Sequence, residues 1–304
     1  MKRLIVLSLA LTLLLSGCGH AVVTSSVTPA PAPAPTESPA PAAPAPTPVP
    51  TLPPETFPFD YAETLADTED FSFAVTALGV DPEENWVVHL RLENRSDEIM
   101  NFRLLWQSIN GLAIDDLFTY RVAVGGVSEQ SFRILKEELA AWGFEEPVQW
   151  SFTLRVSSAE SNREDYFLGE LSASPFGEEK AVRYEYVPGP HDYIVMDNDY
   201  ATVYVTGWQP EDGGLSVDYV AVNRCEKPLR LVLPEKQLLL DGRRMSAELS
   251  DSFGAYATLF GYIPVEGWEG EPPLELQLCL ALEDPGAKKD ALLEDTVTEI
   301  VLCR

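Results

Sequence analysis

The chain has 304 residues, with 48 Asp and Glu against 21 Lys and Arg, and its formal net charge is −27. A surface this acidic repels phosphate backbones, which excludes nucleic acid as a partner. The length is sufficient for two domains of ordinary size.

Residues 1–17 have the layout of a bacterial secretory signal peptide, with a basic pair followed by an apolar run from Leu4 to Leu15. That run is too short for a membrane span, which needs about 20 apolar residues. Leu15-Ser16-Gly17-Cys18 resembles the lipobox of bacterial lipoproteins, in which the cysteine receives a diacylglycerol thioether and becomes the new N-terminus. Cys18 is therefore the predicted lipidation site and anchors the chain in the lipid bilayer. The rest of the chain is expected outside the cytoplasm.

Residues 18–60 form a linker rich in Pro, Ala and Thr. Twelve of the 26 residues from Pro29 to Pro54 are proline. Proline lacks an amide donor and disfavours helical geometry in the residue before it, so we predict a disordered, extended polyproline II stalk. A docking site for a proline-reading module is the alternative. The favoured interpretation is a stalk that holds the folded part away from the membrane.

The segment 61–175 shows the alternation of a β-sandwich. Apolar and polar residues alternate from Glu84 to Glu93 and again from Gln149 to Ser157, which predicts two half-buried strands. Asn94-Arg95-Ser96-Asp97 is a polar turn, and Asn110-Gly111 has the chemistry of a tight hairpin. The expected inward-facing residues are Trp86, Val88, Leu90, Leu92, Trp150, Phe152, Leu154 and Val156.

The segment 197–304 repeats this order about 129 residues later. Leu215 to Ala221 alternates in the same way, Asn223-Arg224-Cys225-Glu226 follows as the polar turn, and Asp241-Gly242 as the hairpin. Leu274 to Leu282 is a further alternating strand.

The two halves therefore look like divergent copies of one all-β unit. The segment 176–196, which contains Pro188-Gly189-Pro190, is predicted to link two independently folding domains, although Tyr184, Tyr186 and Val187 also suit a strand or a docked segment.

One helix is expected in the first copy, because Leu135 to Trp142 is rich in helix formers with Leu135, Leu139 and Trp142 at helical spacing. Gly143 then ends it.

At this point the order of elements resembles the Ig-like modules of clostridial and related lipoproteins. The features that carry the resemblance are the polar Asn-x-Ser-Asp turn, the Asn-Gly turn, the Leu-Glu-rich helix with its glycine, and the final Trp-x-Phe-x-Leu strand. The resemblance covers Glu69 to Ser174 and, more loosely, Asp197 to Arg304, where Gly261-Tyr262-Ile263-Pro264 replaces the helix. It implies tandem Ig-like sandwiches at the envelope, and it carries no catalytic residue.

Signatures of catalysis are sparse. The sequence has no His-Glu-x-x-His or Gly-x-Ser-x-Gly motif. His191-Asp192 could supply two members of a catalytic triad, but no serine is identified as the nucleophile by its sequence context. Asp115-Asp116 and Asp197-Asn198-Asp199 offer oxygen ligands to Ca²⁺ but lack the spacing of a calcium loop, so solvated turns are favoured. We predict no catalytic residue, no metal and no cofactor. The histidines, which lack the spacing of zinc ligands, are His20, His89 and His191.

Three cysteines remain besides the lipidated one, namely Cys225, Cys279 and Cys303. If Leu282 lies opposite Thr296 in the expected final hairpin, Cys279 and Cys303 do not face each other. Thiols are therefore favoured over a disulfide.

Trp268 is the first candidate for ligand binding and Trp208 the second. Glycine and acidic residues flank both in loop-like sequence, Glu266-Gly267-Trp268-Glu269 and Gly207-Trp208-Gln209-Pro210. Such an indole presents a flat apolar face beside hydrogen-bonding groups, as sugar or peptide recognition requires. The favoured interpretation of both, however, is that each covers the end of a sandwich as part of its core.

The sequence thus predicts an all-β protein of two tandem Ig-like β-sandwiches, the first with one short helix. The expected role is a non-catalytic binding or structural module at the cell envelope, with a cell-wall polymer, a peptide or an envelope protein as partner. Two alternatives are an envelope hydrolase that uses carboxylates and the ligand-capturing lipoprotein of a transporter. The latter is normally a larger two-lobed α/β chain.

Overall fold

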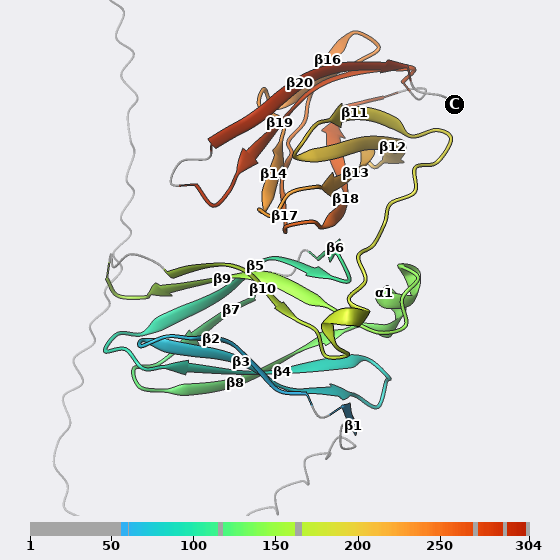
Figure 1. Cartoon of the computed structure of the whole chain (residues 1–304). Helices are drawn as coiled ribbons and strands as arrows, with labels where there is room; N and C mark the ends of the chain where they lie inside the picture. The colour runs from blue at the N-terminus through green and yellow to red at the C-terminus, as the bar shows by residue number, and fades with distance from the viewer. Residues whose placement is uncertain are drawn as a thin grey trace, which may run out of the picture. The chain divides into compact units, whose positions relative to one another are not determined.

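The computed structural model describes residues 56–59, 61–114, 118–161, 166–269, 273–287 and 291–301. Within these ranges α1 (Lys136–Ala141) is the only α-helix, η1 (Glu178–Lys180) is a short 3-10 turn, and every other element is a β-strand. The predicted all-β class with one short helix is therefore confirmed (Figure 1). No helix in the described ranges is long and apolar enough to cross a bilayer.

Several predicted features lie outside the described residues. They are the signal peptide 1–17 with Cys18, the stalk from Pro29 to Pro54, Asp115-Asp116 and Cys303. What the sequence predicts for them stays a prediction.

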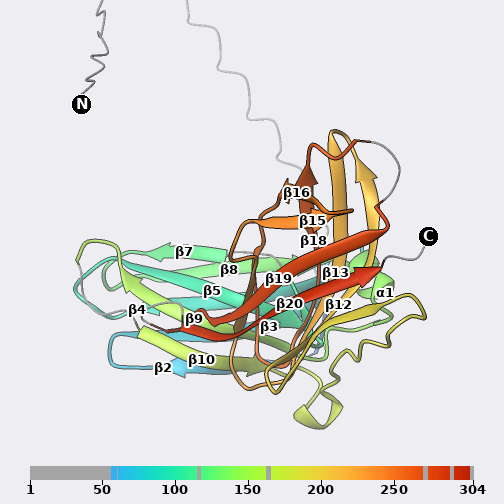
Figure 2. The same ribbon diagram turned by 90° about the horizontal axis from the view of Figure 1, so that it is seen from above.

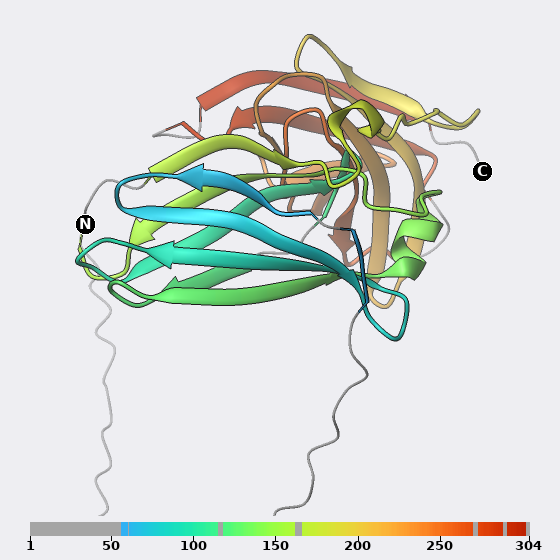
Figure 3. The ribbon, with the colours of Figure 1, turned by 60° about the horizontal axis from the view of Figure 1, so that its bottom comes forward.

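The first half of the described chain packs two antiparallel sheets around one apolar core (Figure 3). One sheet has the order β1-β3-β4-β8, with β2 also paired to β3, and in the other β9 lies between β10 and β5 while β6 and β7 pair with β5. The strands are β1 (Thr56–Phe59), β2 (Glu63–Asp67), β3 (Phe71–Val80), β4 (Trp86–Asn94), β5 (Met100–Ile109), β6 (Leu112–Ala113), β7 (Phe118–Val122), β8 (Val127–Ile134), β9 (Trp150–Ser158) and β10 (Tyr166–Ala173).

Alternation along each strand sends one row of apolar side chains between these sheets. Phe73 of β3 meets Phe152 of β9, with ring centroids 5.5 Å apart. The two strands predicted from the sequence, now β4 and β9, are confirmed, because all eight of their expected inward-facing residues are buried.

The predicted helix is confirmed as α1, although its contact residues differ in part. Leu139 is buried, whereas Leu135 precedes the helix and is 43% exposed, contrary to the expected inward spacing. Gly143 has a φ of 81°, and its N–H donates to the carbonyl oxygen of Ala140 at 3.0 Å, so it ends the helix as expected.

The second half also packs two sheets around its own apolar core. One is the β18-β13-β12-β11 end of a nine-stranded sheet that continues through β6 into the first half. The other has the order β16-β15-β19-β14-β17, with β20 also paired to β19 (Figure 2). The strands are β11 (Tyr193–Asp197), β12 (Ala201–Glu211), β13 (Gly214–Asn223), β14 (Leu229–Val232), β15 (Gln237–Leu240), β16 (Arg243–Ser246), β17 (Ser250–Phe253), β18 (Thr258–Glu266), β19 (Glu275–Asp284) and β20 (Ala291–Val301).

The final hairpin forms as β19 and β20, but its register differs from the sequence prediction. Leu282 pairs with Glu294 rather than Thr296, and Cys279 pairs with Val297. A register shift between Leu282 and Glu283 accompanies this offset of two residues. Leu274, expected on the inward face, lies before β19 and is 44% exposed.

Asn94 at the end of β4 binds three carbonyl oxygens, one at the end of β7 and two in loops. Its side-chain amide donates to the carbonyl oxygens of Glu98, Val122 and Ala123 at 2.8, 3.1 and 3.0 Å, and its Oδ1 accepts from the N–H of Ser96 at 3.0 Å. The side chain is fully buried. The predicted polar turn therefore ends β4 as a hydrogen-bonded corner.

Asn223 at the end of β13 makes the same corner 129 residues later. Its amide donates to the carbonyl oxygens of Lys227 and Gly254, both at 2.7 Å, and its Oδ1 accepts from the N–H of Cys225 at 2.9 Å. The thiol of Cys225 also donates to Oδ1 at 3.2 Å, as the hydroxyl at the equivalent position of the first half does at 2.7 Å.

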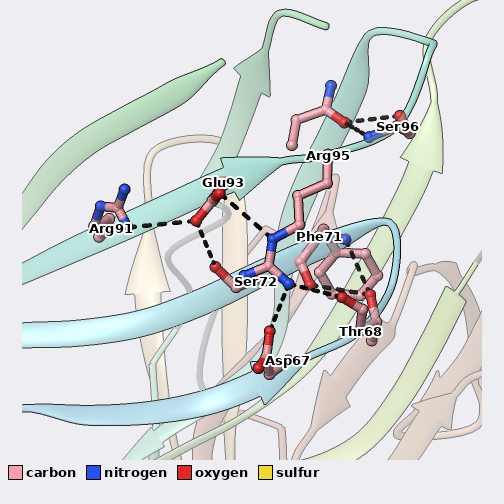
Figure 4. Close-up of polar contacts among 9 residues, drawn as sticks. Asp67, Thr68, Phe71, Ser72, Arg91, Glu93, Arg95 and Ser96 are labelled. Atoms are coloured by element: carbon pink, nitrogen blue, oxygen red, sulfur yellow. Dashed lines mark hydrogen bonds and ion pairs between the residues drawn. The ribbon is translucent and has the colours of Figure 1, made fainter. Parts of the chain in front are cut away.

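The arginine that follows each asparagine is also repeated. Arg95 pairs with Asp67 at 2.7 Å (Figure 4), and Arg224 pairs with Asp197 at 2.8 Å. Each guanidinium also donates to the carbonyl oxygen of the residue after its partner, in the second half Asn198. Asp197 and Asn198, two of the candidate calcium ligands, thus supply corner contacts.

Both predicted hairpin turns are confirmed. Asn110 and Gly111 have φ values of 52° and 79° between β5 and β6, and Asp241 and Gly242 have 48° and 73° between β15 and β16. Such paired positive φ values match the right-handed twist of the flanking strands.

The Asn110-Gly111 turn also joins the two halves. The N–H of Thr258 in β18 donates to the carbonyl oxygen of Gly111 at 2.7 Å, where β6 pairs in parallel with β18. The N–H of Tyr184 donates to the carbonyl oxygen of Asn110 at 2.8 Å. All described residues belong to one compact unit, Leu52–Arg304. The predicted division into domains 61–175 and 197–304 stays a prediction, and β11 begins at Tyr193, inside the predicted linker 176–196.

Candidate functional site

A groove with a volume of about 700 Å³ lies along the edge of β18. One side of β18 is fully paired with β13, whereas the other side meets β6 at Thr258 and Ala247 at Val265. Between these two bridges, from Leu259 to Pro264, no described strand pairs with this edge. The groove occupies this interval.

The side chains of the groove are of two kinds. Exposed aromatic rings come from β18, and acids and hydroxyls come mainly from β17 and the segment before it. Trp106 of β5, Ala113 and Ile114 contribute from the first half. The principal lining residues are Trp106, Asp251, Ser250, Ser252, Phe260 and Tyr262.

Asp251 is held in place from the core. The Tyr219 hydroxyl donates to the Asp251 carboxylate, which links β13 of one sheet to β17 of the facing sheet. Burial first, and then the neighbouring carboxylate, raise the pKa of Tyr219 well above its usual value, so the phenol stays protonated and keeps donating. A hydrogen-bond acceptor is thus fixed in the wall of the groove.

Gly261 makes this contact possible. It lies opposite Tyr219 in the β13–β18 ladder. A Cβ on Gly261 would lie 2.4 Å from the tyrosine hydroxyl oxygen. The tyrosine ring therefore occupies the space that any larger residue would fill, and from there its hydroxyl reaches Asp251.

Phe260 and Tyr262 lie on the outer face of β18, and they are 49% and 58% exposed. The linker between the halves covers part of this face, since the rings of Tyr184 and Tyr186 lie 5.7 and 5.9 Å from the ring of Phe260. The ring of Tyr186 also meets that of Tyr204 on β12 at 5.2 Å. The sequence allowed Tyr184 and Tyr186 to belong to a docked segment, and these ring contacts show that they do. The ring contacts of Tyr184 and Tyr186 reach Phe260 but not Tyr262.

The equivalent strand of the first half shows that the fold does not require these rings. β8 pairs with β4 as β18 pairs with β13, so Glu129, Ser131 and Arg133 occupy the positions of Phe260, Tyr262 and Pro264. The strand at this position can therefore form with a polar outer face, as β8 does. The exposed aromatic pair is a special property of β18.

The rim carries an exposed ion pair. Lys236 Nζ lies 2.9 Å from Glu248 Oε1, and this hydrogen bond lowers the pKa of the Glu248 carboxyl. Because Lys236 is matched by Glu248, Asp251 adds a negative charge to the lining. The groove therefore favours a neutral or positively charged ligand.

The two predicted binding residues lie elsewhere. Trp208 is part of β12 and pairs with Val217, so the loop predicted around it is wrong. Trp268 follows the Gly267 turn after β18, and the guanidinium of Arg243 lies 5.7 Å from its ring centre. Both indoles are half-buried and pack against the core of the second half, and neither is among the residues that line the groove. Their role in binding stays a prediction.

The remaining candidates are scattered. His89 lies in β4, half-buried, and His191 is exposed in the linker, where Asp192 accepts from the Tyr186 hydroxyl and from the N–H of Gly189. Among the described residues, no cluster of three His, Cys, Asp or Glu is placed to hold a metal ion. Cys225 and Cys279 form no disulfide within the described ranges.

The groove residues were not predicted, although β18 carries a signal for them. In Thr258 to Glu266, Phe260 and Tyr262 alternate with Ile263 and Val265 on opposite faces, which is the pattern of a strand with an aromatic outer face. Pro264 in the same row marks an edge strand, because proline cannot donate to a ladder. Asp251 has no comparable local signal.

No family model matches the chain. No curated protein matches it either. Similar solved structures include red sea bream transglutaminase (9% identity, TM-score 0.22, 72% of this chain and 29% of that one) and a structure concerned with host cell surface retention of a bacterial ice-binding adhesin (11%, 0.19, 78% and 75%). Oxalate decarboxylase from B. subtilis is a third (11%, 0.11, 83% and 80%). The chain spans less than a third of the transglutaminase.

Proposed function

We propose that this chain is a lipid-anchored protein of the bacterial cell envelope that binds a partner through the β18 groove without catalysing a reaction. The observation that carries the binding role is the combination of exposed Phe260 and Tyr262 with the fixed acceptor Asp251 along one open strand edge. Apolar surface beside a few well-placed polar groups is the usual composition of a ligand site.

The two halves are proposed to be tandem Ig-like sandwiches. Support comes from the equivalent strand orders β2-β3-β4-β8 and β11-β12-β13-β18 and from the repeated asparagine corners. Such sandwiches commonly present binding surfaces at strand edges and loops held by a rigid core.

The proposed location rests on the sequence Leu15-Ser16-Gly17-Cys18 and on the proline-rich segment that follows it. In this arrangement the acyl chains insert into the bilayer, and the stalk places the groove within reach of envelope polymers or proteins.

Replacement of the anchoring thiol tests the proposed location. We expect Cys18→Ala to abolish incorporation of a fatty-acid analogue and to leave the chain unprocessed or released, because Cys18 is the one cysteine of the sequence that lies in the lipobox. Cys225→Ala is the matched control and should label and fractionate like the unaltered chain, since Cys225 serves the corner of β13. Persistent labelling of the Cys18→Ala chain would contradict the proposal.

A further inference from the structure

Between Leu259 and Pro264, the edge of β18 that borders the groove pairs with no strand among the described residues. Backbone N–H and C=O groups alternate between the two sides of a strand. The N–H of Thr258 points to the β6 side, where it donates to Gly111. Phe260 and Tyr262 follow at intervals of two, with no register shift in β18, so their N–H and C=O groups point the same way. Pro264 ends the row of donors.

An open strand edge is matched most directly by another extended backbone. We propose that the β18 groove binds an extended peptide, which pairs with Phe260 and Tyr262 as an added strand and places a Lys or Arg side chain at Asp251. This inference rests on the proposed binding function and specifies its ligand class.

Three features of the groove fit this occupant. The β6 bridge at Thr258 shows that β18 already accepts a partner strand on this side, and a bound peptide would continue that row where β6 ends. The rings of Phe260 and Tyr262 flank the edge and would cover the apolar side chains of the peptide.

Charge supplies the third feature. Asp251 is fixed by Tyr219, and Glu248 balances Lys236 at the rim. The net charge of the whole chain, −27, further attracts basic peptides and repels acidic ones.

The test uses the full chain in mild detergent and fluorescence anisotropy with labelled eight-residue peptides. The probes are an alternating Lys-Val peptide, its Glu-Val counterpart, and a Lys-Val peptide whose alternate backbone nitrogens are methylated. The methylated probe has the same charge and side chains but fewer backbone donors. We expect it to bind about tenfold more weakly, because its pairing with β18 is lost. The Glu-Val peptide should not bind measurably.

Two variants locate the site. Asp251→Asn removes the charge yet keeps an oxygen that accepts from Tyr219, and it should weaken Lys-Val binding about fivefold. Asp212→Asn is the control, since it removes the same charge in the exposed turn between β12 and β13 and should leave binding unchanged. Bound Lys-Val peptide should also slow hydrogen exchange at the amides of Phe260 and Tyr262.

Equal affinity for the methylated and unmethylated probes, or equal effects of the two variants, would overturn the inference. A neutral cell-wall oligosaccharide serves as a further probe. If it binds in a Tyr262-dependent manner while the peptides do not, the peptide assignment is wrong and the proposed binding function stands. If neither class binds, both are wrong.

Discussion

Trp208 and Trp268 each contact the core of the second half while part of the indole remains at the surface. Trp208 shares the face of Val217, its fully buried partner on β13, so it extends the core toward one end of the sheet. Trp268 lies below Arg243, which adds a cation–π contact. Such half-buried indoles stabilise the fold whether or not they also touch a ligand.

We therefore expect Trp208→Ala and Trp268→Ala each to lower the free energy of unfolding by about 2 kcal/mol, less than the ~3–5 kcal/mol typical of a fully buried tryptophan. Thermal or denaturant melts measure this loss. Tyr262→Ala is the comparison, because its exposed ring should cost less than about 0.5 kcal/mol. Unchanged stability in both tryptophan variants would indicate surface indoles and would favour their use in binding.

At the level of elements, Gly261 couples β18 to the facing sheet through Tyr219 and Asp251. Gly261→Ala would force the buried tyrosine ring away from its position, since the new Cβ has no room. We expect a loss of about 1–3 kcal/mol in the free energy of unfolding, measured by denaturant titration.

Gly169→Ala in β10 is the matched control for that change. Nothing lies within 4 Å of the position of its Cβ, so the substitution should be neutral or slightly stabilising. If both variants lose the same free energy of unfolding, lack of room for a Cβ is not the reason why glycine is needed at position 261.

The sequence predicts those elements whose information is local. Alternation located β4, β9, β13 and most of β19, and the Asn-Gly and Asp-Gly pairs located both hairpins. Glycine and proline flank Trp208, and these residues predict a loop there. In β12, however, a register shift between Val205 and Gly207 accommodates the glycine, and Pro210 lies where β12 is no longer paired with β11.

The non-local features could not be predicted in the same way. The register of β19 and β20 depends on the irregularity at Leu282 and on the geometry of their turn, neither of which shows in the alternation of single strands. Likewise the contact of Tyr219 with Asp251 joins facing sheets across 32 positions of sequence. Only the packing of the two sheets brings those residues together, so the candidate groove had to come from the structure.

For the molecule as a whole, the sequence predicts that the halves fold independently, and each half has its own core. Fragments ending near Ser174 and starting near Ala181 should each show cooperative unfolding and β-rich circular dichroism. The second fragment keeps Tyr184 and Tyr186 against Phe260. Separation removes the backbone bonds at Asn110 and Gly111 and the ring contact of Tyr184 with Phe144. Two fragments that fold only when mixed would show a single composite domain.

The asparagine corners have a consequence for how such a chain arises and changes. The side-chain partners described for Asn94 and Asn223, carbonyl oxygens and donors alike, lie within the same half as the asparagine, so duplication of the coding segment would copy a complete set of partners at once. Mutation is then free to diversify positions outside the corner, such as Glu129 and Phe260, while the inherited frame persists. At this pair of positions the first half has the polar Glu129 and the second half the aromatic Phe260, while both halves have the same asparagine corner.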